Sequence, residues 1–257
     1  MPHRARRLLV TAGLGLALVG GCTSDGTTGR AVGDPVTEDE ARTLAGLLER
    51  NRERGGADFV VTAPYAEDRL LTLTGAVDFR ERVGHAQAVT SFDDGRPDDV
   101  RTLFFTPEEI WVGDVAGLAD ALAADGAPGA AYLRRPTTSG SEDGTPLLVD
   151  VLTEVLLNLS ARRADDPRAF VDGGYSWAGQ RSIDSRLTTL YRMPEGRTVA
   201  VASTDDTLTQ FVTTVAGAGF DVTVTLSDHG PRRIELPAEE QTAEAGDHPD
   251  VARALGV

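Results

Sequence analysis

The feature that most constrains the fold is a succession of short segments in which apolar and polar residues alternate, joined only by turn motifs such as Asp93-Asp94-Gly95. Alternation with a period of two is typical of strands with one buried face. Consecutive strands joined by tight turns pair antiparallel. The first such segments are residues 59–61, 69–79, 83–92, 100–105 and 110–112.

The second half of the chain continues the pattern. Further candidate strands are residues 131–134, 175–182, 187–193, 198–202, 222–227 and 233–236. Together they predict roughly ten or eleven strands, and a single sheet of that size tends to curl. We therefore expect an α+β protein built on one strongly curved antiparallel sheet.

Helical spacing occurs between the strands. Thr37 and Glu40 form a capping box, and the apolar positions behind it predict one amphipathic helix that ends at Gly55. Residues 115–124 predict a second helix. Residues 208–215 also have helical spacing, although their threonines and valines suit a strand equally well.

The segment 147–159 is apolar at nearly every position except Asp150, Glu154 and Asn158, which stand four residues apart and form one narrow polar stripe. A helix that is apolar over most of its circumference must be covered on most sides. It either packs against protein or lines a space that holds another apolar molecule. The polar loop 137–144 before it is expected to let this helix shift.

The N-terminus predicts export and lipidation. Three arginines among the first seven residues precede the apolar run 8–18, which is too short to span a membrane. Val19-Gly20-Gly21-Cys22 then resembles the bacterial lipobox, in which a peptidase cuts before a diacylglycerol-bearing cysteine. An ordinary secretory signal followed by a chance cysteine is the alternative. As the sole cysteine, Cys22 excludes an internal disulfide and a thiolate zinc cluster.

These observations predict four regions along the chain. Residues 1–21 form a lipoprotein signal peptide, 22–36 an acylated and flexible tether, 37–236 the folded domain, and 237–257 an acidic tail. We expect the mature protein on the outer face of the cytoplasmic membrane, held there by its lipid anchor.

Composition and motifs exclude most other functions. A formal charge of −15 argues against nucleic-acid binding. The histidines His85, His229 and His248 lack the spacing of a metal pair, and the chain contains no nucleophile elbow, phosphate loop or dinucleotide fingerprint. We expect neither an enzyme nor a resident cofactor or metal.

The order of these elements, together with the phrases at 130–134 and 221–230, resembles the LolA-like lipoproteins of actinobacteria, the LppX/LprA/LprF/LprG group. The resemblance implies a half-open barrel whose concave face carries helices. It also implies an apolar cavity between sheet and helices that holds acyl chains of lipids or glycolipids carried in the cell envelope. Residues 197–220 depart from the pattern of this group, so their structure is left open.

Under this hypothesis eleven large apolar side chains are candidates for the cavity. The partners expected are a lipid or glycolipid ligand, the membrane through the acylated N-terminus, and an envelope exporter, with the protein itself a monomer. The alternative is a ligand-free tethered accessory protein that docks on an exporter or a sensor. The candidate cavity residues are Leu71, Leu73, Phe79, Phe104, Trp111, Leu148, Leu152, Val155, Trp177, Val222 and Val224.

Overall fold

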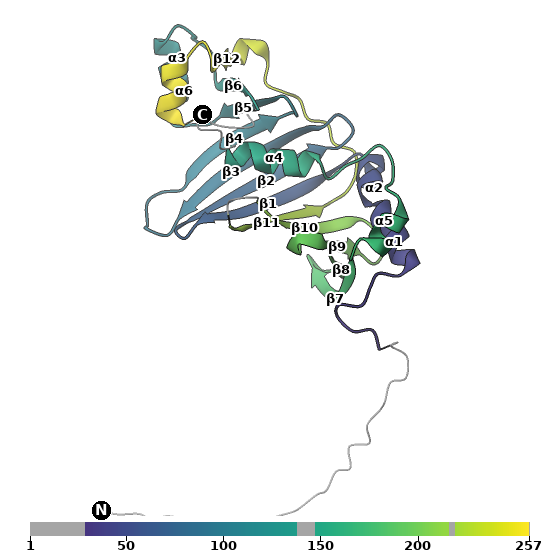
Figure 1. Cartoon of the computed structure of the whole chain (residues 1–257). Coiled ribbons are helices and arrows are strands. Elements are labelled where there is room, and N and C mark those ends of the chain that lie inside the picture. The colour runs from purple at the N-terminus through teal and green to yellow at the C-terminus, as the bar shows by residue number, and fades with distance from the viewer. Residues whose placement is uncertain (1–28, 138–146, 216–218, 257) are drawn as a thin grey trace, which may run out of the picture. The chain divides into compact units, whose positions relative to one another are not determined.

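The computed structural model describes residues 29–137, 147–215 and 219–256, and its folded unit begins at Ala31. Within this part of the chain, twelve strands form one open, curved sheet with the order β12-β6-β5-β4-β3-β2-β1-β11-β10-β9-β8-β7 (Figure 1). The predicted fold class, α+β with a strongly curved antiparallel sheet, is confirmed. The strand count exceeds the ten or eleven expected.

The strands follow the alternating segments of the sequence closely. Their bounds are β1 Gly56–Ala66, β2 Arg69–Asp78, β3 Val83–Phe92, β4 Asp99–Phe105, β5 Glu109–Gly113, β6 Tyr132–Pro136, β7 Ser176–Ile183, β8 Arg186–Arg192, β9 Thr198–Ala202, β10 Leu208–Thr214, β11 Asp221–Ser227 and β12 Thr242–Glu244. Alternation places every second side chain of the long strands on the concave face, where they form the main core.

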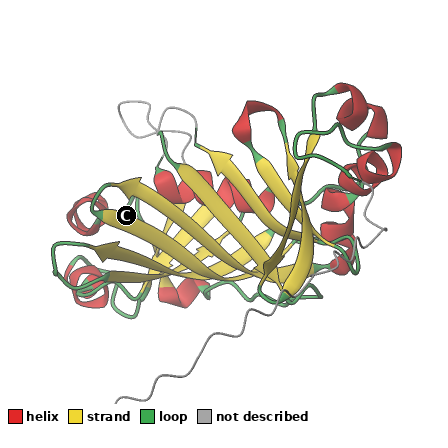
Figure 2. Cartoon of the chain, turned by 90° about the horizontal axis from the view of Figure 1, so that it is seen from below, coloured by secondary structure: helices red, strands yellow, loops and turns green. Residues whose placement is uncertain are grey.

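The helices gather at three places on the sheet (Figures 1 and 2). The helices α1, α2 and α5 lie together at one end, α4 crosses the sheet, and α3 and α6 lie at the other end. Their bounds are α1 Glu38–Ala45, α2 Leu47–Arg54, α3 Leu118–Ala124, α4 Leu148–Leu157, α5 Pro167–Asp172 and α6 Pro249–Leu255, with short 3₁₀ turns at Pro194–Gly196 and Glu239–Gln241.

The first helical region is two helices rather than the one predicted. The capping box is present, because Thr37 N donates to Glu40 Oε2 at 2.8 Å and Glu40 N to Thr37 Oγ1 at 3.3 Å. The interruption falls at Gly46, whose N–H caps α1 by donating to the Arg42 carbonyl. Glycine is a poor helix former, so a break at this position costs little.

The structure decides one open alternative and contradicts one prediction. Residues 208–214, for which helix and strand were both left open, form strand β10, and Phe211 pairs with Val199 of β9 on one side and Val224 of β11 on the other. Their β-branched residues suit a strand, and pairing with both β9 and β11 outweighs the helical spacing. Residues 233–236 form no strand.

Both edges of the sheet are covered by segments close to the chain ends. Beside β7, Gly33 N donates to Trp177 O at 2.9 Å, and Pro35 forms an isolated bridge with Ser176. At the other edge β12 pairs with β6 in parallel, which the prediction of antiparallel pairing did not include. The acidic tail thus provides a strand, and its helix α6 packs against α3 through a small second core.

Candidate functional site

The candidate site is organised by α4, whose side chains point in three directions. Leu152 and Leu156 are fully buried against the core on the concave face. Val151 and Val155 line a cavity on one side of the helix. Leu148 lines a different cavity near the start of the helix. The core interpretation of the apolar segment therefore holds for one side of the helix, whereas other sides border space. That this space holds an apolar molecule stays a prediction.

The polar stripe of α4 is only partly exposed to solvent. Arg135 of β6 binds Asp150 with two hydrogen bonds, Nη2 to Oδ1 at 2.7 Å and Nη1 to Oδ2 at 2.9 Å. Asp150 is 5% exposed and the Arg135 side chain 11%, so this is a buried ion pair. The remaining members of the stripe, Glu154 and Asn158, are exposed. The ion pair therefore holds the first turn of α4 to the sheet.

The segment after α4 is attached to α2. The side-chain amide of Asn51 donates from Nδ2 to the Leu159 carbonyl at 2.7 Å, and Asn51 is fully buried. Because a buried amide without a partner is costly, this bond fixes the position of the segment. Helix α4 is thus held at both ends while its middle borders open space.

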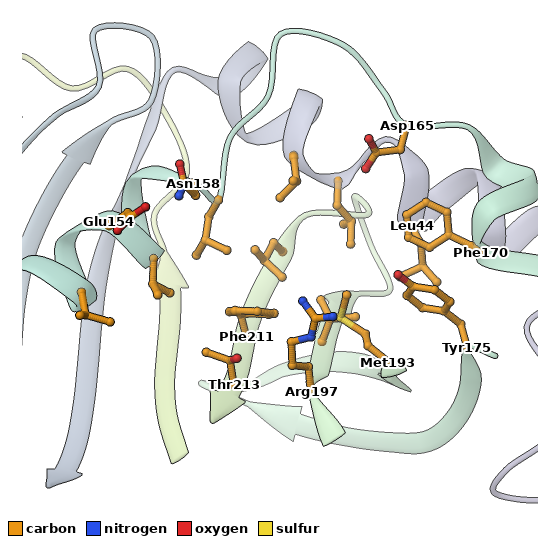
Figure 3. A pocket seen from close by; sticks show the side chains of 17 residues that line it. Leu44, Glu154, Asn158, Asp165, Phe170, Tyr175, Met193, Arg197, Phe211 and Thr213 are labelled. Carbon is orange, nitrogen blue, oxygen red and sulfur yellow. The ribbon is translucent and has the colours of Figure 1, made fainter. Parts of the chain in front are cut away.

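The N-side cavity, as we call it, has a volume of about 420 Å³ and lies between α4, the helices α1, α2 and α5, and the strands β9 and β10 (Figure 3). Its wall is mostly apolar. Five polar or charged side chains interrupt it, namely Glu154, Asn158, Asp165, Arg197 and Thr213. The apolar wall side chains are Leu44, Leu47, Leu48, Val151, Val155, Leu159, Phe170, Tyr175, Met193, Val199, Leu208 and Phe211.

The C-side cavity, with a volume of about 500 Å³, lies near the N-terminal end of α4. Its floor comes from the concave face of β2, β3, β4 and β5, and the tail closes it with α6. The residues that line it are Tyr65, Leu71, Ala88, Thr90, Asp99, Arg101, Leu103, Val112, Arg135, Leu147, Leu148, Val149, Ala252, Arg253 and Gly256.

The structure distributes the eleven predicted cavity residues over several environments. Val155 lines the N-side cavity, and Leu71 and Leu148 line the C-side cavity. Trp177 is half-buried against the main core. A ligand contact for any of them stays a prediction. Those that are buried in the core itself are Leu73, Phe79, Leu152, Val222 and Val224.

Phe104 and Trp111 lie on the opposite face of the sheet. Strand alternation requires this, because their neighbours Leu103 and Phe105 belong to the concave core. Phe104 packs on His85, with ring centroids 4.6 Å apart, and Trp111 lies under the Arg134 guanidinium at 5.8 Å. On the convex side Phe104 is half-buried and Trp111 is buried, and neither lines one of the two cavities.

Several residues of the site were missed by the sequence analysis. Val199 and Phe211 line the N-side cavity, but the structure of residues 197–220 was left open, so neither was named as a cavity residue. Arg135 directly follows the predicted strand 131–134, and nothing in the sequence indicated that it pairs with Asp150. Only the position of Asp150 among apolar residues could have indicated that a buried partner was needed.

Some predictions concern residues outside those described. The signal peptide 1–21, the lipidation site Cys22 and most of the loop 137–144 lie there. Across the described ranges, no helix combines the length and apolar character needed to cross a membrane. Over the same residues, no cluster of three or more histidine, cysteine or carboxylate side chains is arranged to hold a metal ion.

Comparisons with known proteins gave likenesses at the level of structure. No family model and no curated protein matches the sequence. LprF from Mycobacterium bovis is similar with 14% identity and a TM-score of 0.46, covering 80% of this chain and 100% of that one. An uncharacterised conserved protein from Thermus thermophilus covers 80% and 99% with 8% identity and a TM-score of 0.40. A LolA superfamily protein from Nitrosomonas europaea covers 81% and 98% with 10% identity and a TM-score of 0.23.

The first and third of these names agree with the group that the sequence resembles. At such identities and TM-scores the likenesses carry no argument about function. A function for this chain therefore has to be inferred from its own residues.

Proposed function

We propose that this protein binds an acyl chain of a lipid in the N-side cavity and carries or presents that lipid, without chemical conversion. The observation that carries the proposal is the cavity of about 420 Å³ with an apolar wall beside α4. This volume falls within the range of about 300–1,000 Å³ typical of small-molecule sites. Burial of an alkyl chain is favourable by about 25 cal/mol for each Å² of apolar surface removed from water.

The character of the wall favours an alkyl chain over a polar ligand. Helix α4 contributes Val151 and Val155 to the wall, and β10 contributes Leu208 and Phe211. The charged side chains Glu154 and Asp165 are exposed. Polar groups at the exposed part of the wall and apolar groups within it match an amphiphile whose chain is buried.

The cavity also separates this function from the ligand-free accessory protein. A protein that only docks on a partner gains nothing from an unfilled interior, because cavities destabilise a fold. A space of this size next to an apolar helix is instead expected where a ligand completes the packing. We therefore favour lipid binding over docking.

The proposal is tested by native mass spectrometry of the purified protein together with extraction into organic solvent. We expect a bound lipid in the wild type and its loss in Val155→Trp, in which the indole fills the cavity. Val60→Trp is the matched control, because Val60 is 39% exposed on the central strand β1 and lines neither cavity. Absence of lipid from a folded wild type, or equal lipid content in both variants, would contradict the proposal.

We further propose that Cys22 carries the lipid anchor and places the domain on the outer face of the cytoplasmic membrane. The support is the charged, apolar and small-residue order that precedes this cysteine. Multiple acyl chains hold a protein at a membrane almost permanently, so the strongly negative chain needs no electrostatic attraction. Cys22→Ala should abolish incorporation of labelled fatty acid and move the protein from the detergent phase to the aqueous phase. Labelling that persists in Cys22→Ala would refute the assignment.

A further inference from the structure

His229 is a titratable residue with buried ring nitrogens that the proposed binding function does not use. It lies two residues after the end of β11, and both nitrogens of its imidazole are sealed from solvent without a hydrogen-bond partner. The backbone of Leu208 favours protonation of the ring as a minor effect, but it forms no hydrogen bond of normal geometry with either nitrogen. Because nearly all buried polar atoms in folded proteins have a partner, this ring requires an explanation.

The charged groups that act on the ring come from three elements. They are Arg186 at the start of β8, Asp205 in the turn between β9 and β10, and Arg54 at the end of α2. On the segment of His229 itself, Arg232 is paired with a carboxylate of β1 at 2.9 Å. Burial lowers the pKa of His229 below its ordinary value of 6.5, and the two arginines Arg186 and Arg54 add to this shift, whereas Asp205 opposes it. The surroundings therefore disfavour a charged imidazole.

The only carboxylate among these three groups is already bound. Asp205 Oδ1 accepts from Arg186 Nη2 at 2.8 Å and from Thr207 Oγ1 at 2.9 Å. Its Oδ2 lies 3.9 Å from Arg54 Nη2. A protonated His229 would have to compete with two guanidinium groups for this one carboxylate.

The same contacts join α2 to the turn between β9 and β10. Arg54 approaches Asp205, and Arg50 Nε donates to the Asp206 carbonyl at 2.9 Å. We call these contacts between α2 and residues 205–207 the α2 junction. The approach of Arg54 is long and both of its side chains are partly exposed, so the junction is held weakly.

The α2 junction lies beside the N-side cavity. Leu47 and Leu48 of α2 line the cavity, and so does Leu208, which directly follows the junction residue Thr207. Helix α2 and strand β10 also contact one another. Loss of the junction would therefore separate two elements of the cavity wall.

We propose that protonation of His229 opens the α2 junction and with it the adjacent wall of the N-side cavity. When the turn moves away, water solvates the imidazolium and its repulsion from Arg186 and Arg54 is relieved. The opening is a property of the fold alone. Its consequence, faster exchange of a ligand in acid, rests on the proposed function of the N-side cavity.

The first test measures the opening by NMR-detected hydrogen exchange of the wild type at pH 7.5 and 5.5, corrected for intrinsic exchange rates. The reporters are the amides of Ala202 and Asp206, which donate within the turn to Thr207 O and Ala202 O. Their protection should fall by up to about 10-fold at pH 5.5, because the open state takes up a proton near pH 6.5. Low concentrations of urea should not change it, since a local opening exposes little surface.

The control within the same molecule is the amide of Asp93, which donates to the Asp68 carbonyl at 3.2 Å between two turns that contain no histidine. Its protection should not depend on pH in this range. Unchanged protection of Ala202 and Asp206 would overturn the proposal. A fall that occurs only together with that of β2 and β3, with the same dependence on urea, would show global unfolding and would overturn it as well.

The second test assigns the proton to His229. His229→Gln keeps a polar side chain that cannot be protonated, so the pH dependence of protection should disappear. His85→Gln is the matched control and should retain it in full. Burial lowers the pKa of His85 too, but this ring packs on Phe104 on the convex face. An equal pH response in His229→Gln and the wild type would refute the role of His229, and the wild-type measurement above needs neither variant.

The third test connects the opening to the cavity. N-phenyl-1-naphthylamine is a fluorescent apolar probe that stays uncharged at both pH values. Its rate of dissociation from the wild type should rise at least about 3-fold from pH 7.5 to 5.5, and should not change in His229→Gln. A constant rate, while the amides of Ala202 and Asp206 open, would overturn the link to the cavity. Equal binding of the probe by Val155→Trp would instead contradict the proposed function, but not the opening measured by hydrogen exchange.

Discussion

The N-side and C-side cavities share one helix and differ in what stands opposite it. Short helices and the late strands β9 and β10 face α4 in the first, and long, regularly paired strands together with the C-terminal tail face it in the second. The shared helix supplies Val151, Glu154 and Val155 to the first cavity and Leu148 and Val149 to the second. The comparison therefore teaches that the chemical character of each cavity is determined by the elements across from α4.

Loss of the buried ion pair between Arg135 and Asp150 is expected to have the largest effect on the free energy of unfolding. Arg135→Met should lower the free energy of unfolding by about 3–5 kcal/mol, because Asp150 is left buried without a counter-charge. Arg135→Met/Asp150→Leu should recover stability to within about 1–2 kcal/mol of the wild type, because both charges are gone. Urea denaturation followed by circular dichroism measures both. Equal losses in the single and double variants would show that the pairing does not matter.

Two side chains on α4 distinguish core from cavity wall. Leu152→Ala should lower the free energy of unfolding by about 2–5 kcal/mol, because Leu152 is fully buried against the sheet. Val155→Ala should cost less than about 1 kcal/mol, because Val155 already borders open space and is half-buried. Chemical denaturation of both variants without ligand gives the comparison. A similar cost at both positions would mean that the N-side cavity is filled by protein in solution.

His229, which follows strand β11, makes the stability of the fold depend on pH. Burial, assisted by the positive charge of Arg186, lowers the pKa of this imidazole below its ordinary value of 6.5, although Asp205 opposes the shift. The folded protein therefore favours neutral His229, while the unfolded chain takes up a proton near pH 6.5. Neutral His229 therefore makes its full contribution to the free energy of unfolding above pH 6.5, and this contribution is lost as the pH falls below that value.

We expect His229→Leu to remove this pH dependence. Between pH 7.5 and 5.5 the wild type should lose up to about 1.4 kcal/mol more stability than the variant, since one proton changes the free energy by about 1.4 kcal/mol for each pH unit. Thermal unfolding at the two pH values measures the difference. Parallel behaviour of the two proteins would show that His229 is free to ionise in the fold.

The smallest predicted effect concerns the capping box at the start of α1, which supplies Leu44 to the N-side cavity. Thr37→Ala should lower stability by about 1 kcal/mol, because the N–H of Glu40 loses its acceptor. Thr43→Ala inside the same helix is the control and should be neutral or slightly stabilising, because alanine favours helix. Identical melting curves for the two variants would show that the cap contributes nothing.

The sheet was the part most readily predicted from sequence. Alternation over 69–79 and 83–92 placed two long strands almost at their observed bounds, because one face is buried and the other is solvated. The capping box at Thr37 was also correct. Over 208–215 helix and strand stayed open alternatives, since the spacing of the apolar residues fits both periods and only the neighbouring strands decide between them.

The candidate site was less accessible to prediction. The apolar circumference of α4 indicated that something covers it, and the sequence analysis left core and cavity as alternatives. Which faces meet side chains and which meet space depends on contacts between residues distant in sequence, such as Val155 with the strands that contain Val199 and Phe211. Phe104 and Trp111 show the same limit, because alternation fixes opposite faces without saying which face is concave.

The coverage of both sheet edges by segments near the chain ends has a practical consequence. An open twelve-stranded sheet would otherwise offer free backbone donors and acceptors to a second copy of itself. Residues 33–35 occupy one border and the brief, glutamate-bearing β12 the other. Affinity tags and truncations for crystallisation should therefore spare both segments, because removing either one would expose the unpaired backbone groups of β7 or β6 to another copy of the chain.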